Sequence, residues 1–407
     1  MKFINISTLF CMASIAATAF ANENCTTPSK FSGSSPKSTI YVIMYLETGE
    51  FFTHLIDGMQ QQAALVGDGV NLKVMSANQN DSKQAEDIML AATQDNTTVG
   101  ILTVDGNTDT LCDSINTVLD TTDIAVVSFD FEGEACSQKQ VLTSQMDDAM
   151  AKLVLDSAVS IEGQGLNVGY VNDLNFAPLR KRNDVWEKYK AMFNWNQVFF
   201  VQNASEFATQ SDLQAAIVNA IEGTLTLNVT FVYAPWDYLS VTTVAAVNAT
   251  VETIDVYGAD INDQDIAVMR SSTWKATAGG DPVYIGGALI RMVAKTAAKE
   301  MIPPFEKEIS IPSTLITQEI LLENNVLNLS ELDDALPAMK LPGFVSACWI
   351  QSLGGGEPPV DDAPSSDVAP VPTPTPVTTD PPSSGNMVSW LTVPVGMILI
   401  MSYLLNY

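Results

Sequence analysis

The fold is decided by residues 38–82, which begin STIYVIMYLETGEFFTHLIDGMQQQAALVG at residues 38–67. Residues 38–46 form an apolar run of strand-forming residues, which is typical of a buried strand. After a break at 47–50, apolar side chains recur at helical spacing from Phe52 to Val66. A second strand is expected at residues 71–76. Strand, helix and strand in this order predict a βαβ unit within a parallel sheet.

The same alternation continues along the chain. Further strands are expected at 98–104, 124–129, 141–143, 167–171, 197–202, 228–233 and 252–257, with an extended segment at 309–320. Helices are expected from Ser82, and at 108–120, 146–161, 177–193, 211–221, 238–247 and 282–299. Two successive sets of this kind predict an α/β fold with two parallel sheets in tandem. Their strand-end loops should face each other across a ligand cleft.

The two ends of the chain depart from this pattern. Residues 1–21 carry an apolar run and a small-residue cleavage site, which predict a secretory signal peptide followed by a polar leader at 22–37. Residues 354–386 are rich in Pro, Ser and Thr and predict an extended stalk. Residues 387–407 are apolar and uncharged, which fits a GPI attachment signal or a transmembrane end. We therefore expect a binding domain at 38–353, tethered to the outer face of the plasma membrane.

Cysteines and glycosylation sequons agree with a secretory route. Of the five cysteines, Cys11 leaves with the signal peptide, and the remaining four suit disulfides in an oxidising compartment. The preferred pairing joins Cys112 to Cys136 and Cys25 to Cys348, although the sequence leaves three connectivities open. Sequons predict N-linked glycans at Asn24, Asn80, Asn96, Asn203, Asn228, Asn248 and Asn328.

The charge and the motifs exclude several classes of function. With 19 basic and 47 acidic residues the net charge is −28, which argues against nucleic acid as a partner. His54 is the single histidine, and the cysteines lack metal-ligand spacing, so we expect no metal and no other cofactor. The sequence contains neither a nucleophile elbow nor a phosphate-binding loop. It therefore favours a protein that is not an enzyme, with a glycosidase acting through two carboxylates as an alternative.

The order of these segments resembles the type I periplasmic sugar-binding proteins, of the ribose-binding and LacI-like kind. The resemblance covers about residues 38–320 and rests on residues 38–64, VVSFD (126–130), NFAPLRKRNDVWEKYKAM (175–192) and VYGADIN (256–262). It implies a first lobe from residues 38–143 and 281–308 and a second lobe from 144–280 and 309–320. It also implies an α/β fold with two doubly wound, Rossmann-like lobes joined by a hinge, and a ligand that is trapped when the lobes close.

The resemblance further implies a set of ligand-binding residues. These are Phe51 and Phe52 as an aromatic pair, Asp130 and Asp260 as strand-end acids, Arg182 at the start of a helix, and Phe207, Trp236 and Asp237. Aspartate and arginine offer charge-assisted hydrogen bonds to hydroxyl groups, and flat rings cover the apolar faces of a sugar. Structural roles are the alternatives: capping for the two acids, a solvated helix face for Arg182, and packing for Trp236.

Four polar positions depart from the family's pattern. Residues 48–50 replace a loop asparagine, Phe131 replaces an arginine, Trp236 an asparagine and Gly280 a glutamine. The pocket should therefore suit a more apolar ligand than ribose, or have lost ligand binding. The sequence predicts a tethered extracellular protein that binds a small polar ligand, above all a carbohydrate, and works with an unidentified membrane partner. A cell-surface interaction or adhesion protein on the same scaffold is the alternative.

Overall fold

The computed structural model describes residues 25–353, except 34–35, 48, 251–252, 302–307 and 342–343. These residues belong to one compact unit of the chain. The expected signal peptide, Asn24, the stalk at 354–386 and the tail at 387–407 lie outside the described residues. None of the helices in the described part is long and apolar enough to cross a membrane.

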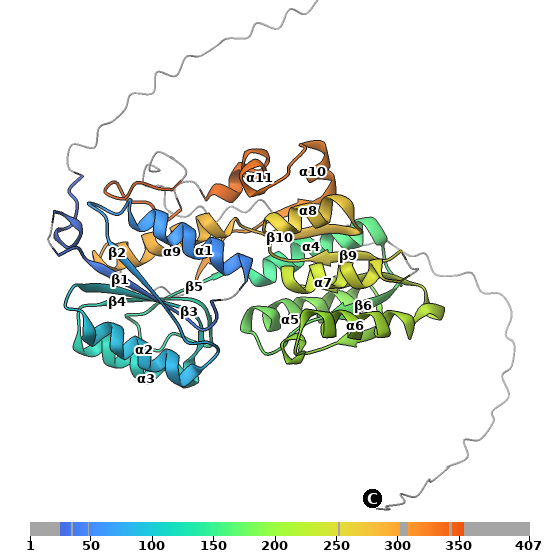
Figure 1. Cartoon of the computed structure of the whole chain (residues 1–407), viewed down its shortest axis with the longest axis horizontal. Helices are drawn as coiled ribbons and strands as arrows, with labels where there is room; N and C mark the ends of the chain where they lie inside the picture. The colour runs from blue at the N-terminus through green and yellow to red at the C-terminus, as the bar shows by residue number, and fades with distance from the viewer. Residues whose placement is uncertain are drawn as a thin grey trace, which may run out of the picture. The chain divides into compact units, whose positions relative to one another are not determined.

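The first lobe is built on a parallel sheet of six strands in the order β11-β5-β4-β3-β1-β2. The strands are β1 (Thr39–Met44), β2 (Asn71–Ser76), β3 (Thr98–Asn107), β4 (Ala125–Glu132), β5 (Val141–Gln145) and β11 (Ile309–Ile311). Helices α1 (Glu50–Ala63) and α9 (Pro282–Ala297) cover one face, and α2 (Asp81–Gln94) and α3 (Thr108–Thr121) cover the other (Figure 1). All residues of β1 are buried, because both faces of the sheet are covered.

The second lobe repeats this arrangement with the strand order β12-β10-β9-β8-β6-β7. Its strands are β6 (Asn167–Val171), β7 (Asn196–Val201), β8 (Val229–Ala234), β9 (Asp255–Gly258), β10 (Trp274–Gly279) and the antiparallel β12 (Thr314–Thr317). Its helices are α4 (Asp147–Glu162), α5 (Ala177–Met192), α6 (Gln210–Glu222), α7 (Asp237–Asn248), α8 (Asp263–Ser271), α10 (Gln318–Glu323) and α11 (Leu329–Ala335). Short 3-10 turns occur at Ser29–Phe31, Ala204–Glu206, Leu225–Leu227 and Pro337–Lys340. The predicted α/β class with two doubly wound sheets is confirmed.

Three parts of the expected pattern differ from the structure. Helix α8 and strand β10 were not predicted, and neither was α11. Residues 309–320 are not one extended segment of the second lobe: β11 pairs with β5 in the first sheet, β12 pairs with β10 in the second, and α10 begins at Gln318. Pro312 lacks the N–H that a strand ladder needs, so β11 ends before it.

Within the described residues the chain crosses between the lobes four times. It passes from β5 to α4, from β10 to α9, and from β11 to β12. The fourth crossing follows α11, because Met339 packs in the second core whereas Leu341 and Trp349 pack in the first. Leu341 and residues 344–353 therefore belong to the lobe in which the fold began.

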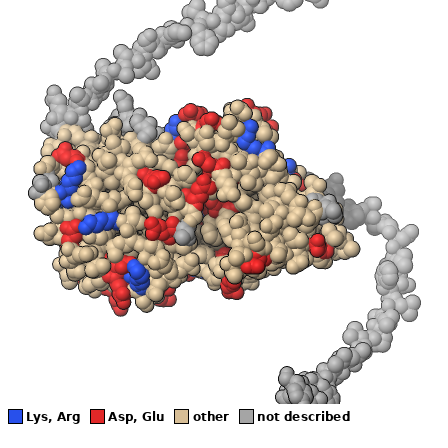
Figure 2. Space-filling view, in the orientation of Figure 1, with Lys and Arg blue, Asp and Glu red and all other residues tan. Residues whose placement is uncertain are grey.

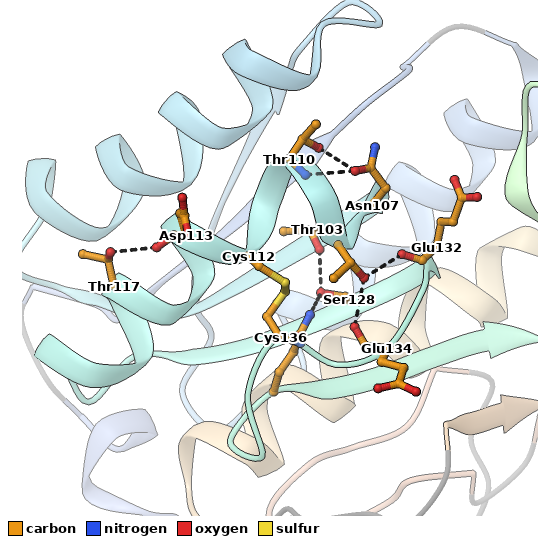
Figure 3. The surroundings of a disulfide bond; sticks show 12 residues. Thr103, Asn107, Thr110, Cys112, Asp113, Thr117, Ser128, Glu132, Glu134 and Cys136 are labelled. Carbon is orange, nitrogen blue, oxygen red and sulfur yellow. Dashed lines mark hydrogen bonds between the residues drawn. A yellow bond between two sulfur atoms is a disulfide. The ribbon is translucent and has the colours of Figure 1, made fainter.

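Two disulfides are present, and they are those of the preferred pairing. Cys25 and Cys348 join the two ends of the described chain, with Cα atoms 5.8 Å apart. Cys112 of α3 and Cys136 join the helix to the loop after β4, as Figure 3 shows. Beside this second bond, Thr103 donates a hydrogen bond of 2.7 Å to the Ser128 hydroxyl between β3 and β4. The loop beyond β4 is thus held against the first lobe.

Close contact between α1 and α9 fixes the position of α1. A Cβ atom at Gly58 would overlap the carbonyl oxygen of Val283, and one at Gly286 would overlap that of Leu55. Glycine at these positions lets the two backbones meet. Since α1 begins at Glu50, this contact also positions the aromatic residues of its first turn.

Candidate functional site

A cavity of about 70 Å³ lies where residues from the strand ends of both sheets meet. It is lined by Leu46, Phe51, Phe52, Asp105, Asp130, Gln145, Phe176, Pro178, Leu179, Arg182, Trp236 and Asp260. Those of the first lobe come from the ends of β3, β4 and β5, from the β1–α1 connection and from the first turn of α1. Those of the second come from α5 and the residue before it, and from the residues that follow β8 and β9. This is the carboxyl edge of both parallel sheets, where α/β folds place ligands.

Six of the predicted binding residues line this cavity: Phe51, Phe52, Asp130, Arg182, Trp236 and Asp260. Phe207 and Asp237 do not. Phe207 packs against the second core. Asp237 is buried at the start of α7, where its carboxylate accepts hydrogen bonds from Asn262 Nδ2 at 2.8 Å and from the Tyr238 N–H at 2.7 Å. Both residues have structural contacts instead of an open face toward the cavity.

Aromatic rings enter the cavity from both lobes. Phe51 and Phe52 of α1 lie edge to face, with ring centroids 5.5 Å apart. Phe176 and Trp236 of the second lobe lie 5.8 Å apart at a tilt of 54°. Phe176 was not predicted, although it stands directly before α5 in the segment that carried the family resemblance. The cavity can therefore hold a ligand with apolar faces between rings.

Arg182 is buried in an ion-pair network inside the second lobe. The residue is only 2% exposed. Its Nε donates a hydrogen bond of 2.9 Å to Asp147 Oδ1. Nη1 donates to Asp260 Oδ2 at 2.8 Å and to the Pro235 carbonyl at 2.7 Å. Burial alone would lower the pKa of Arg182, but the two carboxylates raise it above its usual value. Arg182 is thus not on a solvated helix face, and its donors are already engaged.

Asp105 and Asp130 stand side by side at the edge of the first sheet. Val104 pairs with Phe129 and Gly106 with Phe131, so the two aspartates are neighbours on parallel strands. Both have a left-handed backbone, with φ of 49° and 53°, which aspartate tolerates better than most residues. Asp105 was not predicted, because the expected strand ends at Val104 whereas β3 extends to Asn107.

These two carboxyl groups receive little hydrogen bonding from the protein. Asp130 accepts one bond of 3.3 Å from the Gln145 N–H. In the part of the chain that the structure describes, no group donates to the Asp105 carboxylate. Burial raises the pKa of Asp105 to about 7, with a further contribution from Asp147. Burial, followed by Asp147 and Asp105, also raises the pKa of Asp130 well above its usual range.

Gln145 connects the two lobes at the base of the cavity. It is 4% exposed at the end of β5, and its Nε2 lies 3.5 Å from Asp260 Oδ1. Its Oε1 is buried without a hydrogen-bond partner among the described residues. The sequence carried no signal for this residue, because the predicted strand ended at residue 143.

Comparison with known proteins gives one family. The family model described as periplasmic binding protein domain matches residues 40–301. A solved 5-methylthioribose transporter solute binding protein from Thermotoga lettingae is 28% identical, with a TM-score of 0.69 over 76% of this chain and 96% of that chain. A sugar ABC transporter structure from Yersinia enterocolitica is 20% identical, with a TM-score of 0.68, and covers 80% of this chain and 96% of its own.

A third solved structure is the Caulobacter myo-inositol binding protein. It is 19% identical, has a TM-score of 0.61, and covers 72% of this chain and 97% of its own. No curated protein matches the chain.

Proposed function

The chain belongs to the periplasmic binding protein domain family, and from this premise we propose that it captures a small polar ligand, above all a carbohydrate, between its two lobes. It binds without chemistry of its own. The solved structure of the Thermotoga lettingae protein is a complex with 5-methylthioribose, a sugar that carries an apolar substituent. A ligand of that character fits the departures of this chain from the family's polar pattern.

The observation that carries this proposal is the lining of the cavity. One aromatic pair comes from each lobe, Phe51 with Phe52 and Phe176 with Trp236. The carboxylates of Asp105, Asp130 and Asp260 line the same cavity and can accept hydrogen bonds from hydroxyl groups. Rings that cover apolar faces and acceptors at the edge are the groups that a sugar ring requires.

Contacts between the lobes support capture by closure. Arg180 of α5 pairs with Glu132 at the end of β4. Lys181 Nζ lies 3.6 Å from Glu308 Oε2, just before β11. These pairs are partly exposed and are therefore weak enough to break and re-form. A ligand that contacts both lobes shifts the population toward the closed arrangement.

We place the protein outside the cell, tethered through its C-terminal residues and glycosylated. The signal-like residues 1–21 and the two disulfides support this placement. Among the predicted glycan sites, Asn80, Asn96, Asn228 and Asn248 are exposed, and Asn203 and Asn328 are half-buried. Exposed sequons are accessible to glycosylation. Mass spectrometry before and after glycosidase treatment tests this part of the proposal.

Thermal unfolding in the presence of sugars and polyols tests the binding role. A ligand that binds only the native state raises its stability, by about 2.7 kcal/mol at a hundredfold excess over Kd. Phe51→Ala should remove the shift in melting temperature, since it deletes a ring that lines the cavity. Phe200→Ala, on the exposed edge strand β7, is the matched control and should keep it. If no compound of the panel moves the melt, the binding role is wrong.

A cell-surface interaction protein without a small ligand is the second candidate. One observation favours it: Arg182 donates hydrogen bonds to Asp147, Asp260 and the Pro235 carbonyl, so these donors are not free for a ligand. This candidate predicts that none of the small molecules shifts the melt.

A further inference from the structure

Resting on the binding role proposed above, we propose that the ligand is an organic cation of sugar size, whose ammonium group lies between Asp105 and Asp130. The most direct chemical class is an amino sugar. The carboxylates of the cavity, its unpaired hydrogen-bond acceptors and its aromatic rings all favour a cationic ligand.

Acidic groups outnumber basic ones around the cavity. Asp105, Asp130 and Asp260 line it together with one cationic side chain, that of Arg182. A fourth acid, Asp147, forms an ion pair with Arg182. The guanidinium group of Arg182 forms ion pairs with Asp147 at 2.9 Å and with Asp260 at 2.8 Å. Among the described residues no lysine or arginine forms an ion pair with Asp105 or Asp130. Lys181 and Arg182 attract Asp130 only from a distance, and a ligand cation between the two carboxyl groups would favour their ionised form.

The cavity also has more hydrogen-bond acceptors than donors near Asp105 and Asp130. Asp105 and Asp130 are neighbours in register and present carboxylate oxygens to the same cavity. Gln145, more than nine-tenths buried, adds an Oε1 that has no partner in the described chain. Its Nε2 is directed to Asp260, which fixes the oxygen on the other side. An ammonium group has three donors and no acceptor, which suits a cavity lined by these acceptors, whereas a hydroxyl group has one donor.

The aromatic rings are the third feature of the cavity. Phe51, Phe52, Phe176 and Trp236 line the same cavity as the two carboxylates. A cation over the face of an aromatic ring is stabilised by about 0.5 kcal/mol at an exposed site and by about 2 kcal/mol when desolvated. Rings beside carboxylates therefore favour a cationic ligand over a neutral one of the same size.

The approach to the cavity is acidic as well. An adjoining cavity of about 140 Å³ shares Asp105, Asp130, Phe176 and Pro178 with the first, and Asp81 and Glu132 also line it. On the face drawn in Figure 2, acidic side chains form most of the charged surface and gather near its middle. The described residues hold no group of acidic, histidine or cysteine side chains arranged to bind a metal ion. An organic cation steered by this field is therefore the better match.

Isothermal calorimetry with matched sugars tests the inference. The probes are D-glucosamine, D-galactosamine and D-mannosamine, each compared with its parent hexose and with its N-acetyl form, which keeps the substituent but loses the charge. At least one amine should bind about tenfold or more tightly than both neutral partners, since a hydrogen bond to a charged group contributes about 1.5–3 kcal/mol. Asp105→Asn should remove this preference, and Asp130→Asn should do the same.

The control is Asp113→Asn, on the exposed side of α3 (Figure 3), which deletes the same charge from the same lobe and should leave the preference intact. Melting curves of the empty variants show that they fold, which keeps a lost preference interpretable. If a neutral hexose binds as tightly as its amine, the inference is wrong while the binding role stands. If no probe of either series binds, while neutral sugars such as 5-methylthioribose do, the inference is likewise wrong. If nothing binds, both fail.

Discussion

Replacing Arg182 with methionine should lower the free energy of unfolding of the second lobe without changing its native fold. Methionine keeps most of the side-chain volume but removes the guanidinium group. The variant loses the bonds from Nε to Asp147, from Nη1 to Asp260 and from Nη1 to the Pro235 carbonyl. Asp147 and Asp260 then remain buried without a cation.

The expected loss is about 3–5 kcal/mol in the free energy of unfolding at neutral pH. That is the usual cost of removing one partner of a buried ion pair, most of which comes from the charges left behind. The loss should shrink as the pH falls toward about 4, because an unpaired buried carboxylate takes up a proton and ceases to be a charge. Burial already raises the pKa of Asp147, which places this change within an accessible range.

Urea denaturation of the two proteins at neutral and at acidic pH measures the effect. Arg180→Met is the matched control, because Arg180 lies two residues earlier on the same helix and forms a partly exposed pair with Glu132. That pair should contribute about 1 kcal/mol or less. The reasoning is refuted if Arg182→Met costs no more than Arg180→Met, or if its cost is the same at both pH values.

Three further outcomes follow from other contacts. Asp333→Asn should stabilise the protein increasingly from about pH 4 to about pH 8 and by a constant amount above that, as thermal melts at several pH values would show. Burial and the neighbouring Asp281 raise the pKa of Asp333 to about 8, so within this range the folded protein keeps a proton that the unfolded chain has lost. Gly58→Ala should cost about 1–3 kcal/mol in urea denaturation, since its Cβ meets a carbonyl oxygen of α9. Replacing Cys25 and Cys348 together by alanine should cost about 2–5 kcal/mol, measured in the same way.

Each of these outcomes has a matched control. Asp334→Asn, an exposed neighbour of Asp333, should show no such gain with pH. Gly223→Ala should cost less, because the nearest atom to its Cβ would be 3.3 Å away instead of 1.9 Å. The disulfide between Cys112 and Cys136 closes a separation of 24 residues against 323, so its loss should cost less. An equal effect of variant and control would contradict the corresponding reasoning.

The framework of the fold was predictable because its strands and helices have clear periodicity. The bounds of β2 and β6 agree with the expected 71–76 and 167–171, and helix α5 differs by one residue. The missed elements are those in which the apolar signal is weak or short. Helix α8 contains five polar or charged residues among nine (Asp263, Gln264, Asp265, Arg270 and Ser271), and α10 and α11 have six and seven residues. Such elements depend on packing against the rest of the lobe.

The family resemblance predicted several residues that line the cavity. The prediction was wrong or incomplete where tertiary contacts determine whether a side chain faces the cavity. Asp105 and Gln145 stand one or two residues beyond the expected strand ends, and a strand boundary cannot be located that closely from sequence. Arg182 was assigned to the site by position, but the sequence does not reveal that Asp147 and Asp260 occupy its donors. Phe207 and Asp237 illustrate the same gap, because local packing withdraws them from the cavity.

The fourth crossing between the lobes determines how the molecule can open. Met339 belongs to the second core and Leu341 to the first, and two residues of extended chain span at most about 7 Å. The lobes therefore cannot separate at this point, nor at the equally short passage from Gln145 of β5 to Asp147 of α4. A change in their relative orientation is thereby limited to a rotation about these crossings. Beyond the fourth crossing, the N–H of Leu353 donates a bond of 3.1 Å to Gln62 of α1. A pull applied at residue 353 would thus act first on the contacts of the first lobe.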